Sequence, residues 1–479
     1  MIIKSGKCVG GGKCEECGKC NLYNTTTRKK KLTYLPEGFA PDVEVTGEPD
    51  QKRYGIAFDI GTTTVVGMLW NLNNNTLVDM IAKTNPQSQF GADVISRITY
   101  SMESTKHQKT MQDKIIGCFN EMIREFADQY QISGQEIRKA TVVGNTTMGH
   151  LFLGIDASSL ARAPFDPAYT GPVQKRAAEL DIKIDPDAEV YLLPNIAGHV
   201  GSDIVGVLLA SGIKKQPGLQ LAIDVGTNGE IVLARDGRML TCSTAAGPAF
   251  EGARIYQGMR AARGSIERVR IENGEVVIEV IEDCEPVGIC GSGLIDAVAQ
   301  MLDAGIINFK GNIISAEDAS SKGLHPELVA RLRKGDNGNE FVLVWKSRSE
   351  DIVINQKDIR EVQLAKGAIY GGITILMQCM GVDSSMLEKI LLAGAFGSYI
   401  SKKSALRIGL LPMIDEGKIE HIGNAAGVGA CMALLSKQER EEAVKQSVEV
   451  EHVELALHPN FEREYLYAMY FPKENLKQA

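Results

Sequence analysis

Two Asp–Gly–Thr turns, about 165 residues apart, carry the residue types best suited to chemistry. Each turn follows an apolar, β-rich run and leads into a second one. The residues of the first turn are Asp59, Gly61, Thr62, Thr63 and Thr64, and those of the second are Asp224, Gly226, Thr227 and Asn228. A single Asp-x-Gly hairpin is common, but two that both lead from an acid into Gly-Thr indicate duplicated lobes that close on one nucleotide.

The residue types in these turns suit the phosphates of a nucleotide and their counter-ion. We expect glycine to let the backbone reach a positive φ and approach a ligand closely. Backbone N–H groups and threonine hydroxyls can bind phosphate oxygens from opposite sides. Asp59 and Asp224 stand at strand ends, where hard carboxylate oxygens can hold a hydrated Mg²⁺.

A third glycine-rich turn follows the buried run 389–393. Its residues are Gly394, Ala395, Phe396 and Gly397. Small residues at this point allow an adenine or a ribose to lie flat against the backbone. Any strand-to-helix turn can use Gly-x-x-Gly, but this one follows the two Asp–Gly–Thr turns, and that order favours a nucleotide-binding role.

Four of the ten cysteines stand in the first twenty residues, at Cys8, Cys14, Cys17 and Cys20. Thiolates at such short spacing are ligands for an iron–sulfur cluster or for Zn²⁺. The glycines between them would let the loop wrap a cluster. The other six cysteines are scattered, and we expect them to be small buried hydrophobes in a reducing compartment, without disulfides.

Composition excludes several classes of protein. The 479 residues are 44% apolar, with a net charge of −8, so we expect several ordinary cores and no basic nucleic-acid surface. No apolar run of ~20 residues is present, which argues against a transmembrane helix. The start of the sequence lacks the apolar core of a signal peptide, and we therefore expect a cytoplasmic protein.

The elements that must position these residues can be assigned from periodicity. Alternation predicts strands over 65–70, 137–144, 190–193 and 387–392, and a hairpin over 264–284. Apolar spacing of three and four predicts helices over 111–129, 200–210, 291–302 and 358–378. The segment 303–357 is polar and irregular and is expected to be an insertion on the surface. Residues 449–469 are interpreted as an edge strand followed by a tail.

This set of motifs resembles the ASKHA superfamily of actin-like ATPases. Residues 55–67 are similar to its first phosphate motif, 221–233 to its second and 390–398 to its adenosine motif. The small-residue strings 198–206 and 423–430 lie where the superfamily has two helices that cross at a hinge. The resemblance implies an α/β, two-lobed actin-like fold of the ribonuclease-H type, preceded here by a short Cys-rich segment.

The resulting domain division has five parts. Residues 1–24 form a Cys-rich iron–sulfur segment and 25–51 a flexible linker. Lobe I spans 52–212, lobe II spans 213–440 with the insertion at about 303–357, and a strand and tail occupy 441–479.

Longer strings resemble one branch of the superfamily, the reductive activators of corrinoid proteins. They cover residues 85–97, 143–147, 246–252 and 288–293. The resemblance implies an enzyme that couples ATP hydrolysis with Mg²⁺ to electron transfer and returns a Co(II) corrinoid on a partner protein to Co(I). It also implies an electron donor such as a ferredoxin or a reductase, and it is compatible with a homodimer.

The superfamily pattern also gives the candidates for activation of water. Asp203, on the expected interlobe helix, is the first and Glu230 the second, although Glu230 can equally be an acid that orders the turn. The chain has no Asp-x-His-x-x-Gly corrinoid motif, so the cobalt is assigned to the partner.

The Cys-rich segment departs from the family pattern. The spacing of Cys8, Cys14 and Cys17 is that of plant-type 2Fe–2S loops, which need a far larger domain, whereas the C-x₂-C-x₂-C end is typical of 4Fe–4S ligation. A small 4Fe–4S centre is favoured. A 2Fe–2S cluster, a Zn²⁺ site and a metal-free remnant stay as alternatives.

Three other functions remain open from the sequence. A small-molecule kinase of the ASKHA type would need a polar substrate cleft with a base. An activator of a 2-hydroxyacyl-CoA dehydratase would carry its cluster cysteines inside the ATPase region. A zinc-tethered nucleotide switch would bind metal without redox chemistry.

Overall fold

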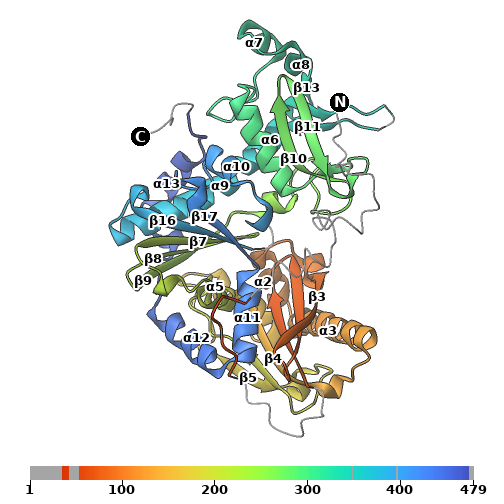
Figure 1. Cartoon of the computed structure of the whole chain (residues 1–479), viewed down its shortest axis with the longest axis vertical. Helices are drawn as coiled ribbons and strands as arrows, with labels where there is room; N and C mark the ends of the chain where they lie inside the picture. Colours follow the sequence, from red (N-terminus) through yellow and green to blue (C-terminus); the bar gives the residue numbers. More distant parts are fainter. Residues whose placement is uncertain (1–34, 43–52, 348, 395–396, 474–479) are drawn as a thin grey trace.

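Two six-stranded mixed sheets form the core of two lobes (Figure 1). The structure, a computed structural model, describes residues 35–42, 53–347, 349–394 and 397–473. In spatial order the first sheet contains β3 (Thr76–Thr84), β2 (Thr64–Asn71), β1 (Tyr54–Ile60), β4 (Ile137–Gly144), β6 (Glu189–Leu192) and β5 (Val173–Arg176). The second contains β17 (Ile419–Gly423), β16 (Leu387–Ala393), β7 (Leu219–Val225), β8 (Gly229–Arg235), β9 (Arg238–Thr244) and β18 (Glu451–His452).

The two sheets repeat one arrangement around their central strands. β1 pairs antiparallel with β2 and parallel with β4. In the same way β7 pairs antiparallel with β8 and parallel with β16. Asp59 lies opposite Val66 in the first hairpin and Asp224 lies opposite Glu230 in the second. Each lobe therefore presents an acid near the end of its central strand, followed directly by its turn.

Alternation along β1 explains how the first sheet is covered on both faces. Ile56 and Phe58 belong to a core formed with α3 (Thr105–Tyr130) and α4 (Thr146–Leu153). Ala57 points to the other face, into a core shared with α5 (Ser202–Ser211), α11 (Ala425–Leu435) and residues of the second sheet. The helices α5 and α11 therefore lie between the two sheets (Figure 1).

Glycines allow α5 and α11 to cross closely, as the small-residue strings predicted. A Cβ on Gly429 would lie 2.3 Å from the Cα of Gly206, and a Cβ on Gly206 would lie 2.6 Å from the carbonyl oxygen of Ala426. Neither position can take a larger side chain unless the backbone moves. This crossing fixes the contact between the two lobes next to the nucleotide turns.

On the outer face of the second sheet, α9 (Gln356–Met380) packs on β8 and β9, and the same core continues into α6 (Gly291–Asp303) and two small sheets. One consists of β11 (Glu275–Val280), β10 (Ser265–Glu272) and β12 (Gly288–Ile289). The β10–β11 hairpin was predicted, and Asn273 and Gly274 turn it with φ of 50° and 82°.

The other small sheet contains β13 (Leu332–Gly335), β14 (Gly338–Val344) and β15 (Ile352–Asn355). The segment 303–357 was interpreted as irregular, and the structure differs. The runs Phe341–Val344 and Ile352–Ile354 are buried within the core of the second lobe. Their apolar strand signal is short and is surrounded by polar turns, which hid it in the sequence.

The C-terminal part contains the expected edge strand, but helices take the place of the expected tail. β18 is an edge strand of two residues that pairs parallel with β9. It is preceded by α12 (Lys437–Glu449) and followed by α13 (Phe461–Ala468). α13 packs on α9. The two helices approach closely at Gly371, because a Cβ on this glycine would lie 3.2 Å from the Cα of Tyr465. The aromatic residues that suggested a strand are therefore spaced along a helix.

Part of the predicted flexible linker 25–51 is packed against the protein. Leu35 and Phe39 contact the core shared by the lobes. The backbone N–H of Asp42 donates to the carbonyl of Leu435 at 3.1 Å, and the Asp42 carboxylate accepts from the N–H groups of Lys437 (2.6 Å) and Gln438 (3.1 Å). These hydrogen bonds lower the pKa of Asp42 although burial opposes them. Residues 35–42 thus form an anchor at the α11–α12 junction, because Asp42 satisfies free N–H groups at the start of α12.

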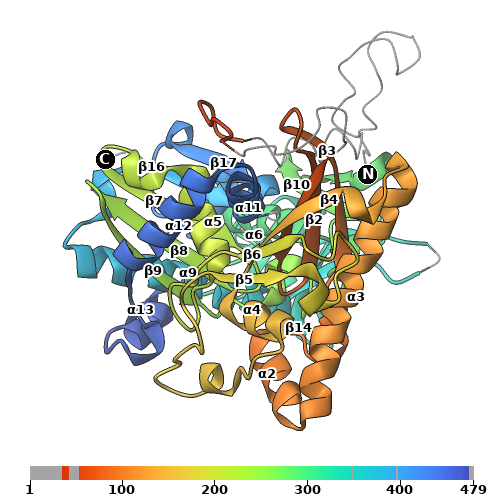
Figure 2. The same cartoon turned by 90° about the horizontal axis from the view of Figure 1, so that it is seen from below.

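Seen from below, α5 and α11 again lie between the β7–β9 and β1–β6 groups of strands (Figure 2). Within the described residues, no helix combines the length and the apolar character needed to cross a membrane.

Candidate functional site

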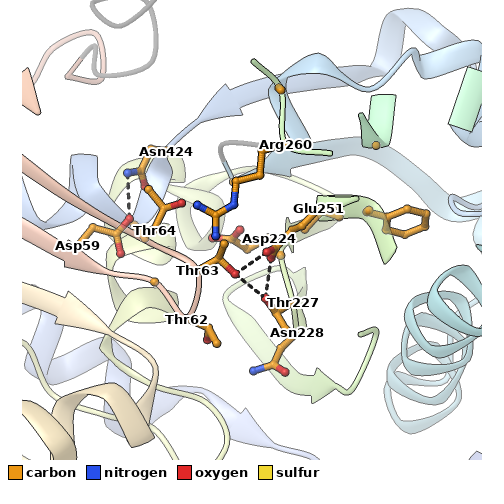
Figure 3. A pocket seen from close by; sticks show the side chains of 18 of the residues that line it. Asp59, Thr62, Thr63, Thr64, Asp224, Thr227, Asn228, Glu251, Arg260 and Asn424 are labelled. Atoms are coloured by element: carbon orange, nitrogen blue, oxygen red, sulfur yellow. Dashed lines mark hydrogen bonds between the residues drawn. The ribbon is translucent and has the colours of Figure 1, made fainter. Parts of the chain in front are cut away.

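A cavity of about 410 Å³ lies where the two lobes meet, and both Asp–Gly–Thr turns open into it (Figure 3). It is also lined by Asn145 from the start of α4, by Asp203 from the first turn of α5 and by Asn424 from the start of α11. The predicted site residues that line it are Asp59, Gly61, Thr62, Thr63, Thr64, Asp203, Asp224, Gly226, Thr227, Asn228, Glu230 and Gly394. Residues far apart in the sequence are thus brought together around one volume.

Two threonines, one from each lobe, meet across this cavity. The hydroxyl oxygens of Thr63 and Thr227 lie 3.3 Å apart. Both hydroxyls donate to the carboxylate of Glu251, and the bond from Thr227 is 2.6 Å long. The paired hydroxyls face one point from opposite sides (Figure 3), which is the arrangement expected for binding a single phosphate group.

The first turn owes its shape to contacts with the rest of its own lobe. The Gly61 N–H donates to the Thr64 carbonyl at 3.0 Å. Asn145 donates to the Thr62 hydroxyl at 3.1 Å, and Arg97, which is fully buried, donates to the Thr62 carbonyl at 2.6 Å. Burial lowers the pKa of Arg97 to about 10.

The reason for glycine in the two turns differs from the expectation. Neither Gly61 nor Gly226 has a φ in the left-handed region. A Cβ on Gly61 would lie only 2.6 Å from the Thr64 carbonyl oxygen, so the tight approach of the backbone excludes a side chain there. At Gly226 the corresponding distance, to the Asn228 carbonyl, is 3.4 Å, which is an ordinary contact.

Five carboxyl groups line the cavity, and the pKa is raised at four of them, Asp59, Asp203, Asp224 and Glu230. Burial, moderated by a hydrogen bond from Asn424, raises the pKa of Asp59 to about 6. Burial and the charge of Asp59 raise the pKa of Asp203 to about 7, and burial and the charges of Asp203 and Asp59 raise the pKa of Asp224 to about 8. Glu230 is raised well above its usual value, by burial first and then by Asp203 and Asp224. Such a group of acids is relieved by a bound cation.

The donor set of the cavity fits a Mg²⁺ ion that accompanies nucleotide phosphates. Carboxylate and amide oxygens are the ligands that Mg²⁺ prefers, and the ion commonly keeps several waters. Asp59 is oriented for this by Asn424, whose amide donates to Oδ2 at 2.9 Å. In the ranges that the structure describes, no three or more His, Cys, Asp or Glu side chains are arranged to hold a metal directly.

The third glycine-rich turn reaches the cavity through its first residue. Gly394 has a φ of 89°, and its N–H donates to the Gly423 carbonyl at 2.9 Å. A Cβ there would lie 2.5 Å from Oδ1 of Asp224, so only glycine fits beside that carboxylate. Gly397 instead accepts a hydrogen bond from the His421 ring at 2.9 Å and is not among the lining residues. Ala395 and Phe396 lie outside the described residues.

The cysteines divide into two groups. Cys8, Cys14, Cys17 and Cys20 lie outside the described residues. Of the six scattered cysteines, which were all expected to be buried, Cys118, Cys242, Cys290 and Cys431 are buried and Cys284 is half-buried. Cys379 is exposed, because it lies near the end of α9. Its sulfur is 3.9 Å from a ring nitrogen of His458.

Several residues of the cavity were not assigned a role from the sequence. They are the lining residues Asn145, Glu251, Arg260 and Asn424, together with Arg97, which supports the first turn from outside the lining. Four of them stood inside strings that carried the family resemblance, so the signal was present without a role attached to it. Arg260 stood in none, and its side chain reaches across to the Thr84 hydroxyl of the other lobe at 2.6 Å.

Comparisons with known proteins match nearly the whole of the described chain. The C-terminal domain of RACo, the ASKHA domain, matches residues 218–479, and the RACo middle region matches residues 54–216. The chain is 38% identical to the corrinoid activation enzyme RamQ of Eubacterium limosum over 425 residues, which cover 88% of this chain and 71% of RamQ. It is 26% identical to the [Co(II) methylated amine-specific corrinoid protein] reductase of Methanosarcina barkeri over 449 residues, covering 86% and 76% of the two chains.

A solved structure agrees with these sequence matches. The reductive activator for a corrinoid, iron–sulfur protein superposes with a TM-score of 0.80 at 37% identity, over 90% of this chain and 68% of that chain. The two-lobed ASKHA fold predicted from the motifs is therefore confirmed. The chain belongs to the RACo family of reductive activators of corrinoid proteins.

Proposed function

We propose that this chain couples ATP hydrolysis to the one-electron reduction of Co(II) to Co(I) in a corrinoid held by a partner protein. The observation that carries the proposal is the meeting of Thr63 and Thr227, 3.3 Å apart, over a cavity that is lined by five carboxyl groups. Family membership supplies the corrinoid as the object of the activity, since both curated relatives are named for corrinoid activation or reduction.

In the proposed hydrolysis the residues of the cavity work by positioning and by charge. Thr62, Thr63, Gly226 and Thr227 hold the phosphates, and Asp59 and Asp224 hold Mg²⁺ through its waters. Mg²⁺ supplies neutralisation of phosphate charge. Asp203 accepts the proton of the attacking water, with Glu230 as the second candidate, while the products are ADP and phosphate. A raised pKa suits Asp203 to this role near neutral pH.

The electron comes from a separate donor of the ferredoxin or reductase class. We propose that Cys8, Cys14, Cys17 and Cys20 would hold an iron–sulfur centre, with 4Fe–4S favoured, which would supply a one-electron carrier between the donor and the partner. The ATP-driven step supplies the free energy by favouring one arrangement of the two lobes, because a ligand shifts an equilibrium only by its difference in affinity for the two states.

The test is a spectroscopic assay of cobalt under anaerobic conditions. The purified chain, Mg-ATP, a low-potential reductant and a Co(II) corrinoid protein should give the absorbance of Co(I), and ADP in place of ATP should not. Formation of Co(I) that does not depend on ATP would overturn the coupling. Transfer of phosphate to a sugar or a carboxylate would favour a kinase.

The role of the Cys-rich segment has its own test. Removal of residues 1–24 should preserve ATP hydrolysis and abolish cobalt reduction. Iron, sulfide and zinc analysis after anaerobic reconstitution identifies the metal. Stoichiometric zinc without iron would assign the redox centre to another protein.

A further inference from the structure

Glu251 is a hydrogen-bond acceptor that the two lobes share within the cavity. It accepts from Thr63 of the first turn and from Thr227 of the second. These are the hydroxyls that the proposed function assigns to a phosphate. The carboxylate of Glu251 therefore holds the protein's own negative charge at the point where both turns converge (Figure 3).

A carboxylate and a phosphate cannot use the same two hydroxyls at once. Each hydroxyl has a single proton to donate, so a phosphate bound by both would leave Glu251 without these bonds. The two groups are also both anionic, and like charges at contact distance in a partly buried site repel each other strongly. A phosphate that takes both hydroxyls must displace Glu251.

The backbone around Glu251 provides the freedom for such a displacement. Glu251 ends a short 3₁₀ turn, Pro248–Glu251, which is flanked by Gly247 and Gly252 with φ of 76° and 83°. Glycine reaches such conformations without the steric penalty of other residues. Nothing lies within 4 Å of a Cβ position on Gly247, whereas a Cβ on Gly252 would lie 2.4 Å from the Met259 carbonyl oxygen, so the open space is at the Gly247 end of the turn.

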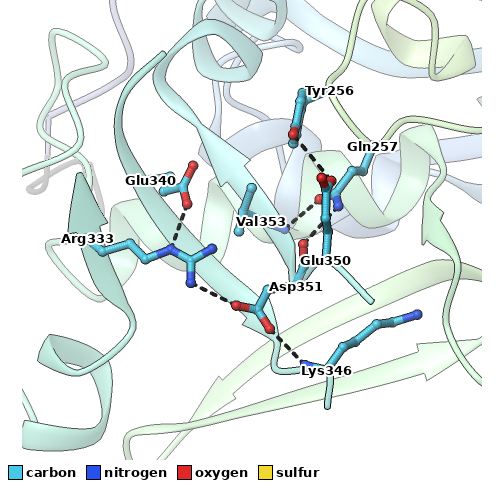
Figure 4. A network of polar contacts seen from close by, with 8 residues as sticks. All are labelled: Tyr256, Gln257, Arg333, Glu340, Lys346, Glu350, Asp351 and Val353. Atoms are coloured by element: carbon cyan, nitrogen blue, oxygen red, sulfur yellow. Dashed lines mark hydrogen bonds and ion pairs between the residues drawn. The ribbon is translucent and has the colours of Figure 1, made fainter. Parts of the chain in front are cut away.

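The chain that follows Glu251 connects the cavity with the outer small sheet. The Tyr256 N–H donates to Asp358 at 2.8 Å. The Gln257 side chain donates to the Asp351 carbonyl and accepts from the Val353 N–H, both at 2.8 Å. Figure 4 shows the two contacts of Gln257, with Tyr256 facing Glu350 on the loop between β14 and β15.

We propose that Glu251 is the sensor of the terminal phosphate of ATP. It competes with that phosphate for Thr63 and Thr227, and its displacement is transmitted along residues 252–260 to the loop 345–351. ADP, which lacks the terminal phosphate, leaves Glu251 on the two hydroxyls. The inference rests on the proposed ATPase function and adds to it the residue that distinguishes ATP from ADP.

The first test compares ATP and ADP affinity by calorimetry, with Mg²⁺ present, in the full-length wild type and in E251Q. Removal of the competing charge should strengthen ATP binding by about tenfold and change ADP binding by less than about twofold. T63V and T227V should weaken ATP binding, which is the opposite sign. E317Q, on the exposed helix α7 (Ala316–Ser321), is the matched control and should change neither affinity.

The second test uses the two tryptophans of the chain. Trp70 is buried, whereas Trp345 is half exposed at the 345–351 loop, with Arg333 stacked 5.7 Å from its ring. In a W70F background ATP should change the fluorescence of Trp345 and ADP should not, and E251Q should remove that difference. A Trp345 signal that ignores ATP would overturn the transmission to the loop.

An unchanged ratio of ATP to ADP affinity in E251Q would overturn the sensor, and a loss of both affinities would assign Glu251 a purely structural role. Neither result affects cobalt reduction by the wild type, which tests the proposed function by itself. Conversely, an ATP-specific effect of E251Q in a chain that reduces no corrinoid would keep the sensor and remove the proposed function.

Discussion

The two nucleotide turns have the same residue pattern but are held in different ways. The first turn is held by its own lobe, through Arg97, Asn145 and Asn85, the last of which donates to the Gly61 carbonyl at 2.8 Å. In the second turn, Thr227 donates a hydrogen bond to Glu251, which also accepts one from Thr63 of the opposite lobe. Their acids differ as well, because Asp59 receives a hydrogen bond from Asn424 and has the lower pKa of the two. The first turn is thus held rigidly by its own lobe. The second turn depends on the hydrogen bond between Thr227 and Glu251, which a phosphate can replace.

The largest effect is expected from neutralising the acid of either turn. D59N and D224N should each lower the rate of ATP hydrolysis by about 10²–10³-fold, because each removes charge beside the metal. Both variants should stay folded, since a buried amide costs less than a buried carboxylate. Phosphate release and circular dichroism measure the two properties. Normal turnover in either variant would remove that acid from the metal site.

Removal of Arg97 should break the fixed turn itself. R97A leaves a cavity and two carbonyl groups, of Thr62 and Gly91, without their donor, so the free energy of unfolding should fall by about 3 kcal/mol. Urea denaturation measures the loss, and R360A, at an exposed position of α9, serves as control. Equal stability of the two variants would show that the first turn does not need this brace.

A pair of asparagines separates stability from metal binding. Asn145 caps α4 and Asn424 caps α11, each accepting an N–H at 2.9 Å, so N145A and N424A should each cost about 1 kcal/mol. Only N424A also removes a contact to Asp59, and it should weaken the Mg²⁺ dependence of ATP binding several-fold more than N145A does. Identical Mg²⁺ titrations would contradict this assignment.

The smallest effect concerns an ion pair between the lobes, away from the turns. A hydrogen bond that His199 donates to Glu454 raises the pKa of His199, while burial opposes it, and His452 lies near enough to compete for Glu454. The pKa of Glu454 is lowered by His199, although burial opposes that shift too. A raised histidine pKa means that its contribution is complete below the unfolded pKa and is lost as pH rises through the folded one. H199Q should therefore destabilise the protein by up to about 1 kcal/mol near pH 6 and by much less near pH 8.

A double-mutant cycle of H199Q and E454Q, followed by urea denaturation at both pH values, isolates this pair. A coupling energy that grows toward high pH would contradict the assignment.

The sequence predicted the two turns and the duplicated lobes because both are local patterns. An acid at the end of an apolar run followed by Gly-Thr can be recognised without knowledge of any partner residue. The close crossing of Gly206 and Gly429 was also predictable, because small residues at helical spacing have few other uses. The helices and strands with long apolar periodicity were found for the same reason.

The residues that distinguish the two turns could not be found in this way. Glu251 is an ordinary acid in the string Gly247-Pro-Ala-Phe-Glu251, and its meaning comes from two threonines that are 188 and 24 positions away. Asn424 and Arg97 likewise gain their roles from a tertiary contact. The strands β13–β15 and the helix α13 were missed because their apolar stretches are short and are interrupted by polar turns.

The anchor formed by residues 35–42 limits how far the Cys-rich segment can travel. Fourteen residues separate Cys20 from Leu35, and a chain of that length spans at most about 50 Å. The short connection therefore keeps the Cys-rich segment close to the anchor, and it has a high effective concentration there. The anchor lies where α11 meets α12. Any rotation of the hinge helices would therefore move the point around which the Cys-rich segment can range. Closure of the lobes on nucleotide could thus change where an electron can be delivered.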